Sequence, residues 1–246
     1  MRKWSLLSIP YVELHCHSGF SFLDGASHPE ELAVRAAEFG YPALALTDHN
    51  GLYGSMEFAH AARRVNVQPI TGAEVTLRDC FPGVEEPEGG HHVTLLAETP
   101  QGYANLCRLL TEAHMGSERG DTRLALPSLL ELSEGLILLS GCAQSPVAAA
   151  MRSSVADGEA FTRKLLDVFG PGSMFMELQD NAVKGDTARN KTLARLAGRM
   201  GLGVVATSNV HYHRPERHRL QDVLVSIKNR ATLDGAHGAR RANKLF

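Results

Sequence analysis

Glu13-Leu14-His15-Cys16-His17-Ser18 follows a short apolar run that begins at Ile9. The run predicts a β-strand over residues 9–14, which places two histidines at the point where the strand ends. Side chains at positions i and i+2 of an extended chain lie on the same side, so His15 and His17 can direct both imidazoles at one point. Neutral imidazole is a common nitrogen ligand of metal ions, which favours a metal site. Two unrelated surface histidines are the alternative, and the later strand ends decide between the two.

The segments that follow alternate between strand and helix patterns. Short apolar runs predict strands, and segments with an apolar stripe predict helices. Seven strands are expected, at residues 9–14, 42–47, 68–77, 91–97, 135–140, 173–179 and 203–207. Helices are expected at about residues 29–39, 54–64, 101–115, 157–169, 187–200 and 216–228.

This order of elements predicts a parallel α/β architecture. No G-x-G-x-x-G follows the first strand and no Walker-type G-K-[ST] occurs in the sequence, so dinucleotide and phosphate-loop folds are unsupported. We therefore expect an α/β barrel, in which the chemistry lies at the C-terminal ends of the strands.

The composition is typical of a globular protein. The chain has 246 residues, 43% of them hydrophobic and 21% charged, which is enough for one large domain with a full core. The net charge of -2 gives no overall attraction to nucleic acid, although a local groove could supply one. Four cysteines without C-x-x-C spacing, and no signal peptide or membrane span, predict a reduced, cytoplasmic protein. We expect one domain over residues 1–230 and a linker or the start of a further module over residues 231–246.

Residues of metal-ligand type recur at or near the predicted strand ends. They combine imidazole, carboxylate and thiol groups, a set that suits Zn, Mn or Fe, and they are too many for a single ion. Two or three divalent metals are therefore implied, and a carboxylate such as Glu74 can bridge two of them. Metals about 3.5–4 Å apart polarise a phosphoryl group and activate water, which points to phosphoester hydrolysis. The candidate residues are His15, His17, Asp24, His49, Glu74, His92, Cys142, Asn209 and His211, of which His92 fits less well because it lies near the start of its strand.

The same residues lie in phrases that resemble the PHP (polymerase and histidinol phosphatase) superfamily, in the order typical of that family. The closest likeness is to the N-terminal PHP domain of bacterial C-family DNA polymerase III alpha subunits of the error-prone type. The resemblance implies a distorted (βα)7, TIM-like barrel with a metal cleft at the C-terminal ends of the strands. The matching phrases are Glu13-Leu-His-Cys-His-Ser, Phe22-Leu-Asp-Gly-Ala, Ala45-Leu-Thr-Asp-His, Thr71-Gly-Ala-Glu, His92-Val-Thr-Leu-Leu-Ala, Gly135-Leu-Ile-Leu-Leu-Ser-Gly-Cys and Val205-Ala-Thr-Ser-Asn-Val-His-Tyr.

The resemblance also implies three metal positions, which we call the first, second and third. Asn209 departs from the family pattern, because active members usually carry Asp there, and a neutral amide oxygen is a poorer ligand than a carboxylate. The first metal is therefore expected to bind more weakly. The implied ligands are His15, His17, Glu74 and Asn209 for the first position, Glu74, His92 and Cys142 for the second, and Asp24, His49 and His211 for the third.

Two classes of function follow. One is a metal-dependent phosphoesterase, acting on single-stranded DNA or 3′ ends as a 3′-5′ exonuclease in replication or repair, with Asp24 or His211 transferring protons. A monoesterase of histidinol-phosphatase type remains an alternative substrate class. The other is a metal-stabilised scaffold of low activity that supports a polymerase module or accessory subunit.

Other polar residues near these phrases have open roles. Asp48 is expected to orient His49 or a neighbouring ligand, with a cap at the strand end as the alternative. Three histidines are interpreted as surface groups, and a cluster of three arginines either holds phosphates or forms a solvated helix face. The histidines are His91, His213 and His218, and the arginines are Arg214, Arg217 and Arg219.

Overall fold

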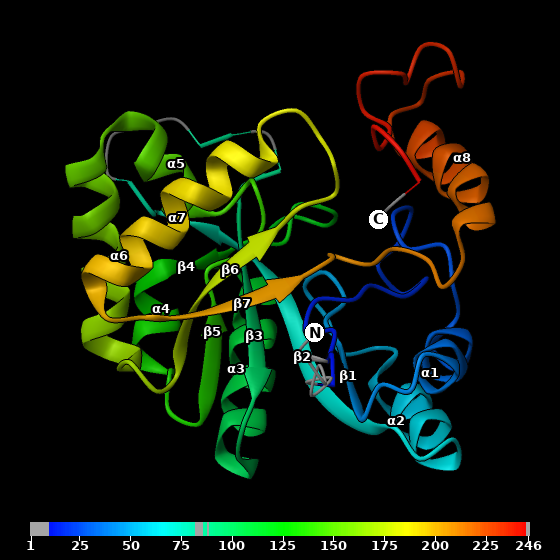
Figure 1. Ribbon diagram of the computed structural model, residues 1–246, viewed down its shortest axis with the longest axis horizontal. Coiled ribbons are helices and arrows are strands. Elements are labelled where there is room, and N and C mark those ends of the chain that lie inside the picture. The colour runs from blue at the N-terminus through cyan, green and yellow to red at the C-terminus, as the bar shows by residue number, and fades with distance from the viewer. Residues whose placement is uncertain (1–9, 82–85, 88, 245–246) are drawn as a thin grey trace, which may run out of the picture.

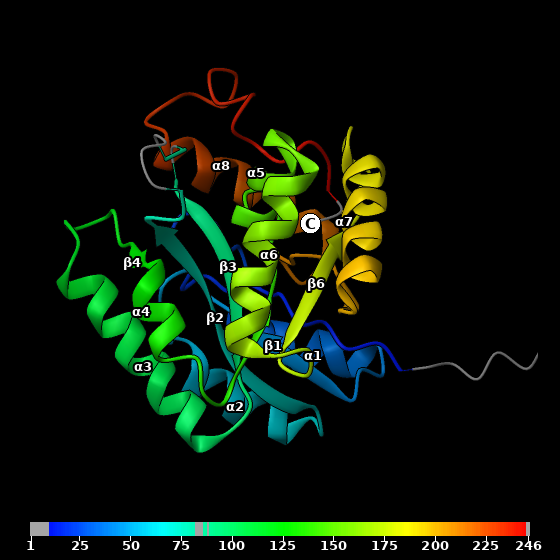
Figure 2. The ribbon, with the colours of Figure 1, turned by 90° about the vertical axis from the view of Figure 1, so that its left-hand side faces the viewer.

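The computed structural model describes residues 10–81, 86–87 and 89–244. A curled sheet is covered on its outside by helices (Figures 1 and 2). Its strands are β1 (Ala43–Leu46), β2 (Gln68–Arg78), β3 (His91–Ala97), β4 (Leu124–Ala125), β5 (Leu136–Leu139), β6 (Met174–Gln179) and β7 (Gly203–Thr207). The α-helices are α1 (Pro29–Glu38), α2 (Ser55–Arg64), α3 (Pro100–Met115), α4 (Leu126–Glu131), α5 (Pro146–Ser153), α6 (Val155–Phe169), α7 (Asp186–Met200) and α8 (His218–Lys228).

The strands are ordered β1-β2-β3-β5-β6-β7, and the short β4 pairs with β2. The pairs β1/β2, β5/β6 and β6/β7 are parallel, as the alternation of strands and helices predicts. β3 is antiparallel to both of its neighbours, β2 and β5. The expectation of a wholly parallel sheet is therefore wrong at this strand, where the described residues among 79–90, between β2 and β3, form no crossover helix.

The predicted first strand is reduced to isolated bridges. Glu13 pairs with Leu44 of β1, and Cys16 pairs with Val210, beyond the end of β7. Residue 9 lies outside the described residues. The N-terminal segment thus lies between the two ends of a curled half-barrel sheet, but single bridges do not establish the complete (βα)7 barrel that was expected.

Successive side chains along each strand point alternately to the two faces of the sheet. In β5, Leu136 and Leu138 pack into the large core beneath α3 to α7, whereas Leu139 belongs to a small cluster on the opposite, inner face. In β2, Ala73 and Val75 belong to the large core, so the residue between them, Glu74, points to the inner face. The inside of the curl is therefore partly polar, and the site lies there.

Two short helices, α4 and α5, were not predicted. α4 has six residues and α5 has eight, which is too short for an apolar stripe to repeat clearly. The start of α5 does carry a sequence signal, since Ser145 precedes Pro146 and its hydroxyl accepts a hydrogen bond from the Ala148 amide. No helix in the described part of the chain has the length and apolarity needed to cross a membrane.

The C-terminal segment, residues 231–244, forms turns beside α8 and returns to the rest of the molecule (Figure 1). Arg240 forms an ion pair with Asp222 of α8 at 3.2 Å. The Asn243 amide donates to the carbonyl oxygen of Asn181 at 2.7 Å, in the loop after β6. These contacts bring the segment over the open end of the sheet.

Candidate metal centre

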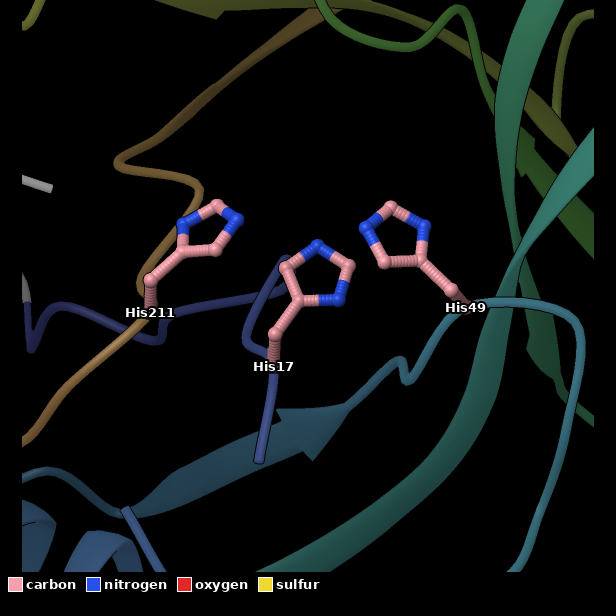
Figure 3. A group of neighbouring side chains, drawn as sticks. All are labelled: His17, His49 and His211. Carbon is pink, nitrogen blue, oxygen red and sulfur yellow. The ribbon is translucent and has the colours of Figure 1, made fainter. Parts of the chain in front are cut away.

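Three histidines from distant parts of the chain meet at this end of the sheet. His17 lies on the N-terminal segment, His49 follows β1 and His211 follows β7, and Figure 3 shows the ring of His17 between the other two. The ring centroid of His17 lies 4.4 Å from that of His49 and 4.7 Å from that of His211. Three imidazole rings lie this close together in a protein interior only when their ring nitrogens have a partner. The arrangement therefore indicates a ligand that the three histidines share.

Glu74 lies at the centre of the histidines. Its carboxylate is 3.0 Å from His49 Nδ1, 3.3 Å from His17 Nε2, 3.3 Å from His92 Nδ1 and 3.6 Å from His15 Nε2. The residue is buried, with 1% of its surface exposed. Four imidazoles thus surround one buried carboxylate, and a bridging role for Glu74 stays a prediction.

The antiparallel direction of β3 explains the position of His92. In a parallel strand, a residue near the start would lie at the opposite end of the sheet from the site. Because β3 runs the other way, its start lies beside the ends of its neighbours, and His92 pairs in register with Thr76 of β2, two residues from Glu74. His92 therefore joins the cluster despite its place in the sequence.

Hydrogen bonds on the outer side of the rings fix their orientation. His15 Nδ1 donates to Glu177 Oε1 at 2.7 Å. His17 Nδ1 donates to Ser21 Oγ at 3.1 Å, and His92 Nε2 donates to the Gly89 carbonyl oxygen at 2.9 Å. The second ring nitrogen of each faces the centre, where a metal can take the place of a proton. Histidines that bind metals are held in this way by an oxygen on the far side of the ring.

This arrangement concentrates acceptors at one point. The Nε2 atoms of His15 and His17 lie 3.1 Å apart, and both face the Glu74 carboxylate. The Oε1 atom of Glu74 is buried and has no hydrogen bond among the described residues. Lone pairs this close repel one another unless a proton or a cation lies between them. The donor set therefore fits a divalent metal.

The pKa values follow from burial and the shared charge. Burial alone would raise the pKa of Glu74, but the neighbouring imidazoles of His92, His49 and His15 hold it well below its usual value. Burial, together with the neighbouring imidazoles of His49 and His211, holds the pKa of His17 well below its usual value. The carboxylate is therefore ionised and His17 neutral near pH 7, as metal binding requires.

In the third expected set, Asp24 lies close to both histidines, although Asp24 is in none of the described groups whose ligand atoms all lie within 4.8 Å of one another. Asp24 Oδ2 is 3.0 Å from His49 Nε2 and 3.4 Å from His211 Nε2. The loop that carries Asp24 is held in place by the Ala26 amide, which donates to the carbonyl oxygen of His211 at 2.8 Å. Burial lowers the pKa of His211, and the Arg241 charge lowers it further, so this imidazole is neutral.

Asn209 and Cys142 line the same cleft as the histidines. Asn209 has a φ of 49°, in the left-handed region that Asn tolerates, and its buried Oδ1 has no hydrogen bond within the described structure. Cys142 is buried, and the Glu74 charge together with the neighbouring Cys142 raises the pKa of His92 against the effect of burial. Cys142 belongs to none of the groups of three described residues whose ligand atoms lie within 4.8 Å of one another, so its role as a ligand stays a prediction.

Groups of ligand atoms that lie within 4.8 Å of one another agree in part with the expected sets. His15, His17 and Glu74 form one group, as expected for the first position. The other groups are His49, Glu74 and His92, and His17, His49 and His211. His49 is thus shared more widely than expected.

Two polar residues behind the ligands organise the site. Asp48 accepts hydrogen bonds from the Ser18 amide and the Ser21 hydroxyl, both at 2.7 Å, and Ser21 in turn contacts His17. This agrees with an orienting role for Asp48. Glu177, which the sequence did not reveal, accepts from His15 and from the Gly141 amide at 3.1 Å. Its only sequence signal is a carboxylate on the inner face of an apolar strand.

Some surface residues differ from expectation. His91 is buried and not a surface group, because its ring packs against Phe81 with centroids 5.3 Å apart. Arg214 and Arg217 form ion pairs with Glu38 and Glu31 of α1. These two arginines form part of a charged surface with α1 and do not line the cleft, which agrees with the solvated-face interpretation.

The site opens into a cleft with a volume of ≈ 980 Å³. Asp24, Glu74 and His92 lie among its walls, and so does Arg241 of the C-terminal segment, which the sequence did not identify. Positively charged and aromatic residues lie around the cleft as well, although the net charge of the chain is negative. They are Arg123, Lys184, Arg189, Lys228 and Phe22.

Comparisons with known proteins agree with this geometry. A family model described as the PHP domain matches residues 13–181. Error-prone DNA polymerases of Symbiobacterium thermophilum and Mycolicibacterium paratuberculosis are 40% and 42% identical over 95% and 94% of this chain. The chain spans only about a fifth of the length of these relatives, 22% and 21%. A crystal structure from Bifidobacterium adolescentis, described as a candidate metal-dependent phosphoesterase, shares the fold with a TM-score of 0.51 at 15% identity, covering 82% of this chain and 88% of the other.

Proposed function

Because the chain belongs to the PHP domain family, we propose that it is a metal-dependent phosphoesterase that removes nucleotides from DNA 3′ ends, working beside a C-family polymerase module in the cytoplasm. The observation that carries the proposal is the ionised Glu74 at the centre of four imidazoles, within 3.6 Å of each. Such a set of ligands is typical of a hydrolytic metal centre.

Two or three divalent ions of Zn, Mn or Fe, the metals that such ligands ordinarily bind, would be held at the three positions. Bound metals would supply Lewis-acid stabilisation of the phosphoryl charge and a nucleophilic water. The ligands proposed are His15, His17, Glu74 and Asn209, then Glu74, His92 and Cys142, and then Asp24, His49 and His211.

We assign proton transfer to Asp24 or His211. His211 Nδ1 donates to the Asn209 carbonyl oxygen at 2.7 Å, which leaves Nε2 as the acceptor on the cleft side. Asp24 presents Oδ2 to the histidines, while Oδ1 lies 3.5 Å from Gln221 Nε2. Burial alone would raise the pKa of Asp24, but His211, His49 and Arg241 hold it well below its usual value, so Asp24 stays ionised and His211 is favoured as the proton carrier.

A polynucleotide is favoured over a small monoester by the walls of the cleft. Lys184 and Lys228 are exposed there, and positive charges attract phosphates along a strand. Phe22, with 80% of its surface exposed, offers an aromatic face for a base. The names of the relatives, error-prone DNA polymerases, support DNA and a polymerase module as partners.

A metal-stabilised scaffold of low activity is the second candidate. Asn209 favours it, because a neutral amide oxygen binds a cation less strongly than a carboxylate does. The ligand types at the other eight positions favour an enzyme. The bridges at Glu13 and Cys16 support the view that the N-terminal segment closes the sheet into a distorted (βα)7 barrel around the site.

Hydrolysis of a 3′-labelled single-stranded DNA and of a phosphate monoester, each with Mn²⁺ and with Zn²⁺, tests the proposal. We expect metal-dependent release from the DNA 3′ end that falls at least about 100-fold in His15→Ala. His60→Ala, on the outside of α2, is the matched control and should keep full activity. Hydrolysis of the monoester alone would contradict the exonuclease, and no hydrolysis despite bound metal would favour the scaffold.

A further inference from the structure

Arg241 contacts two of the residues proposed for the third metal position. One of its terminal nitrogens, Nη2, donates a hydrogen bond to His211 Nε2. The other nitrogen of that ring, Nδ1, is engaged with the Asn209 carbonyl oxygen at 2.7 Å. Both ring nitrogens of His211 are therefore in use, and the lone pair that a metal requires is the one that Arg241 occupies.

Asp24 divides its two oxygens between the cluster and the C-terminal segment. Oδ2 faces His49 and His211, at 3.0 Å and 3.4 Å. Oδ1 lies 3.5 Å from Arg241 Nη2. A guanidinium is permanently charged, so it satisfies Asp24 and His211 as a cation would.

We propose that Arg241 competes with a divalent metal for His211 and so sets the affinity of the third metal position. This inference rests on the proposed function and adds a residue that regulates its metal site. Binding of the third metal requires the guanidinium to leave Nε2, because one lone pair cannot serve both and because two cations at this distance repel each other.

Contacts on both sides of Arg241 hold the C-terminal segment in place. Its neighbour Arg240 is paired with Asp222 of α8, and Asn243 is bonded to the Asn181 carbonyl oxygen. These contacts anchor the segment on both sides of Arg241, whose own side chain is 29% exposed. The guanidinium can therefore move toward the open cleft while the backbone stays anchored. Displacement of the segment by a partner would have the same effect on the third position.

The test is a titration of the metal-free 246-residue chain with Mn²⁺ by calorimetry, which separates sites of different affinity. We expect Arg241→Gln to tighten the third position about tenfold. Arg241→Lys, which keeps the charge on a flexible stem, should stay closer to the wild type. Arg240→Gln is the matched control, because Arg240 lies in the same segment and contacts Asp222 and His237 but no candidate ligand.

The same substitution made in a His49→Gln protein distinguishes an effect at the third position from a general effect on Mn²⁺ binding. His49→Gln removes the proposed ligand of the third position other than the two that Arg241 contacts, so the effect of Arg241→Gln on Mn²⁺ binding should disappear there. Unchanged or weaker Mn²⁺ binding by Arg241→Gln in the wild-type background would overturn the inference while leaving the phosphoesterase intact. Failure of every protein to bind Mn²⁺ would contradict the proposed function together with the inference.

Discussion

His15 Nδ1 lies 2.7 Å from Glu177 Oε1, and both side chains are completely buried. The pair joins the N-terminal segment to β6 and turns the other nitrogen of His15, Nε2, toward Glu74. Burial would lower the pKa of His15, but the charges of Glu177 and Glu74 raise it well above its usual value. A bound metal would replace the proton that this environment stabilises.

We predict that Glu177→Gln weakens the first metal position. The amide keeps the size of the side chain but removes the charge that orients His15 and makes it a stronger ligand. The loss should be about 10–100-fold in metal affinity, measured by competition with a chelating dye. Glu38→Gln, an exposed residue paired with Arg35, is the control. Equal affinities for the two variants would show that Glu177 serves only the fold.

Asn209→Asp should strengthen metal binding and increase turnover. A carboxylate adds a full charge to the first position, and Asp tolerates the left-handed backbone that Asn209 adopts, with φ 49°. Zn²⁺ or Mn²⁺ affinity is expected to rise about tenfold, measured by titration, together with a higher rate of phosphoester hydrolysis. Tighter metal binding with an unchanged rate of hydrolysis would show that Asn209 does not limit the activity.

Cys142→Ser should distinguish a metal ligand from a buried apolar residue. Thiolate binds Zn²⁺ much better than it binds Mn²⁺, so the variant should lose more affinity for Zn²⁺ than for Mn²⁺. Cys80→Ser is the control, because burial raises the pKa of the Cys80 thiol to about 12 and this residue belongs to the large core. A Zn²⁺ affinity unaffected by Cys142→Ser would remove Cys142 from the second position.

Gly141→Ala should disturb both stability and metal binding. Gly141 has a φ of 90°, and an added Cβ would lie 2.3 Å from the His92 carbonyl oxygen. We expect a loss of roughly 2 kcal/mol or more in the free energy of unfolding, measured with urea. Gly198→Ala in α7, where nothing lies within 4 Å of the new Cβ, should instead stabilise by about 0.5–1 kcal/mol. Similar effects from the two substitutions would contradict this view of Gly141.

The sequence was most informative where local patterns decide structure. Apolar runs predicted β1, β2, β3, β5, β6 and β7 within a few residues, because buried strands need such runs whatever their neighbours. The direction of β3 was not predictable, since the same run suits either orientation and only the loop after β2 decides it. The predicted first strand failed because its backbone pairs only at single positions.

The residues of the site divide in the same way, into those with a local sequence signal and those without one. His15, His17, His49 and Glu74 were predicted from their places beside strands and from family motifs, and the structure brings them together. Glu177 was missed because a carboxylate in a strand has no local signature. Arg241 was missed because its contact with His211 depends on how the C-terminal segment folds back, which no spacing reveals.

The metal content of the purified chain tests the account most directly. The protein would be produced with Zn and Mn in the medium, dialysed, and measured by mass spectrometry for metal per chain. The account predicts two to three bound ions, reduced in Glu74→Gln, which removes the charge shared by four imidazoles. Less than one transition metal per chain in the wild type would contradict it.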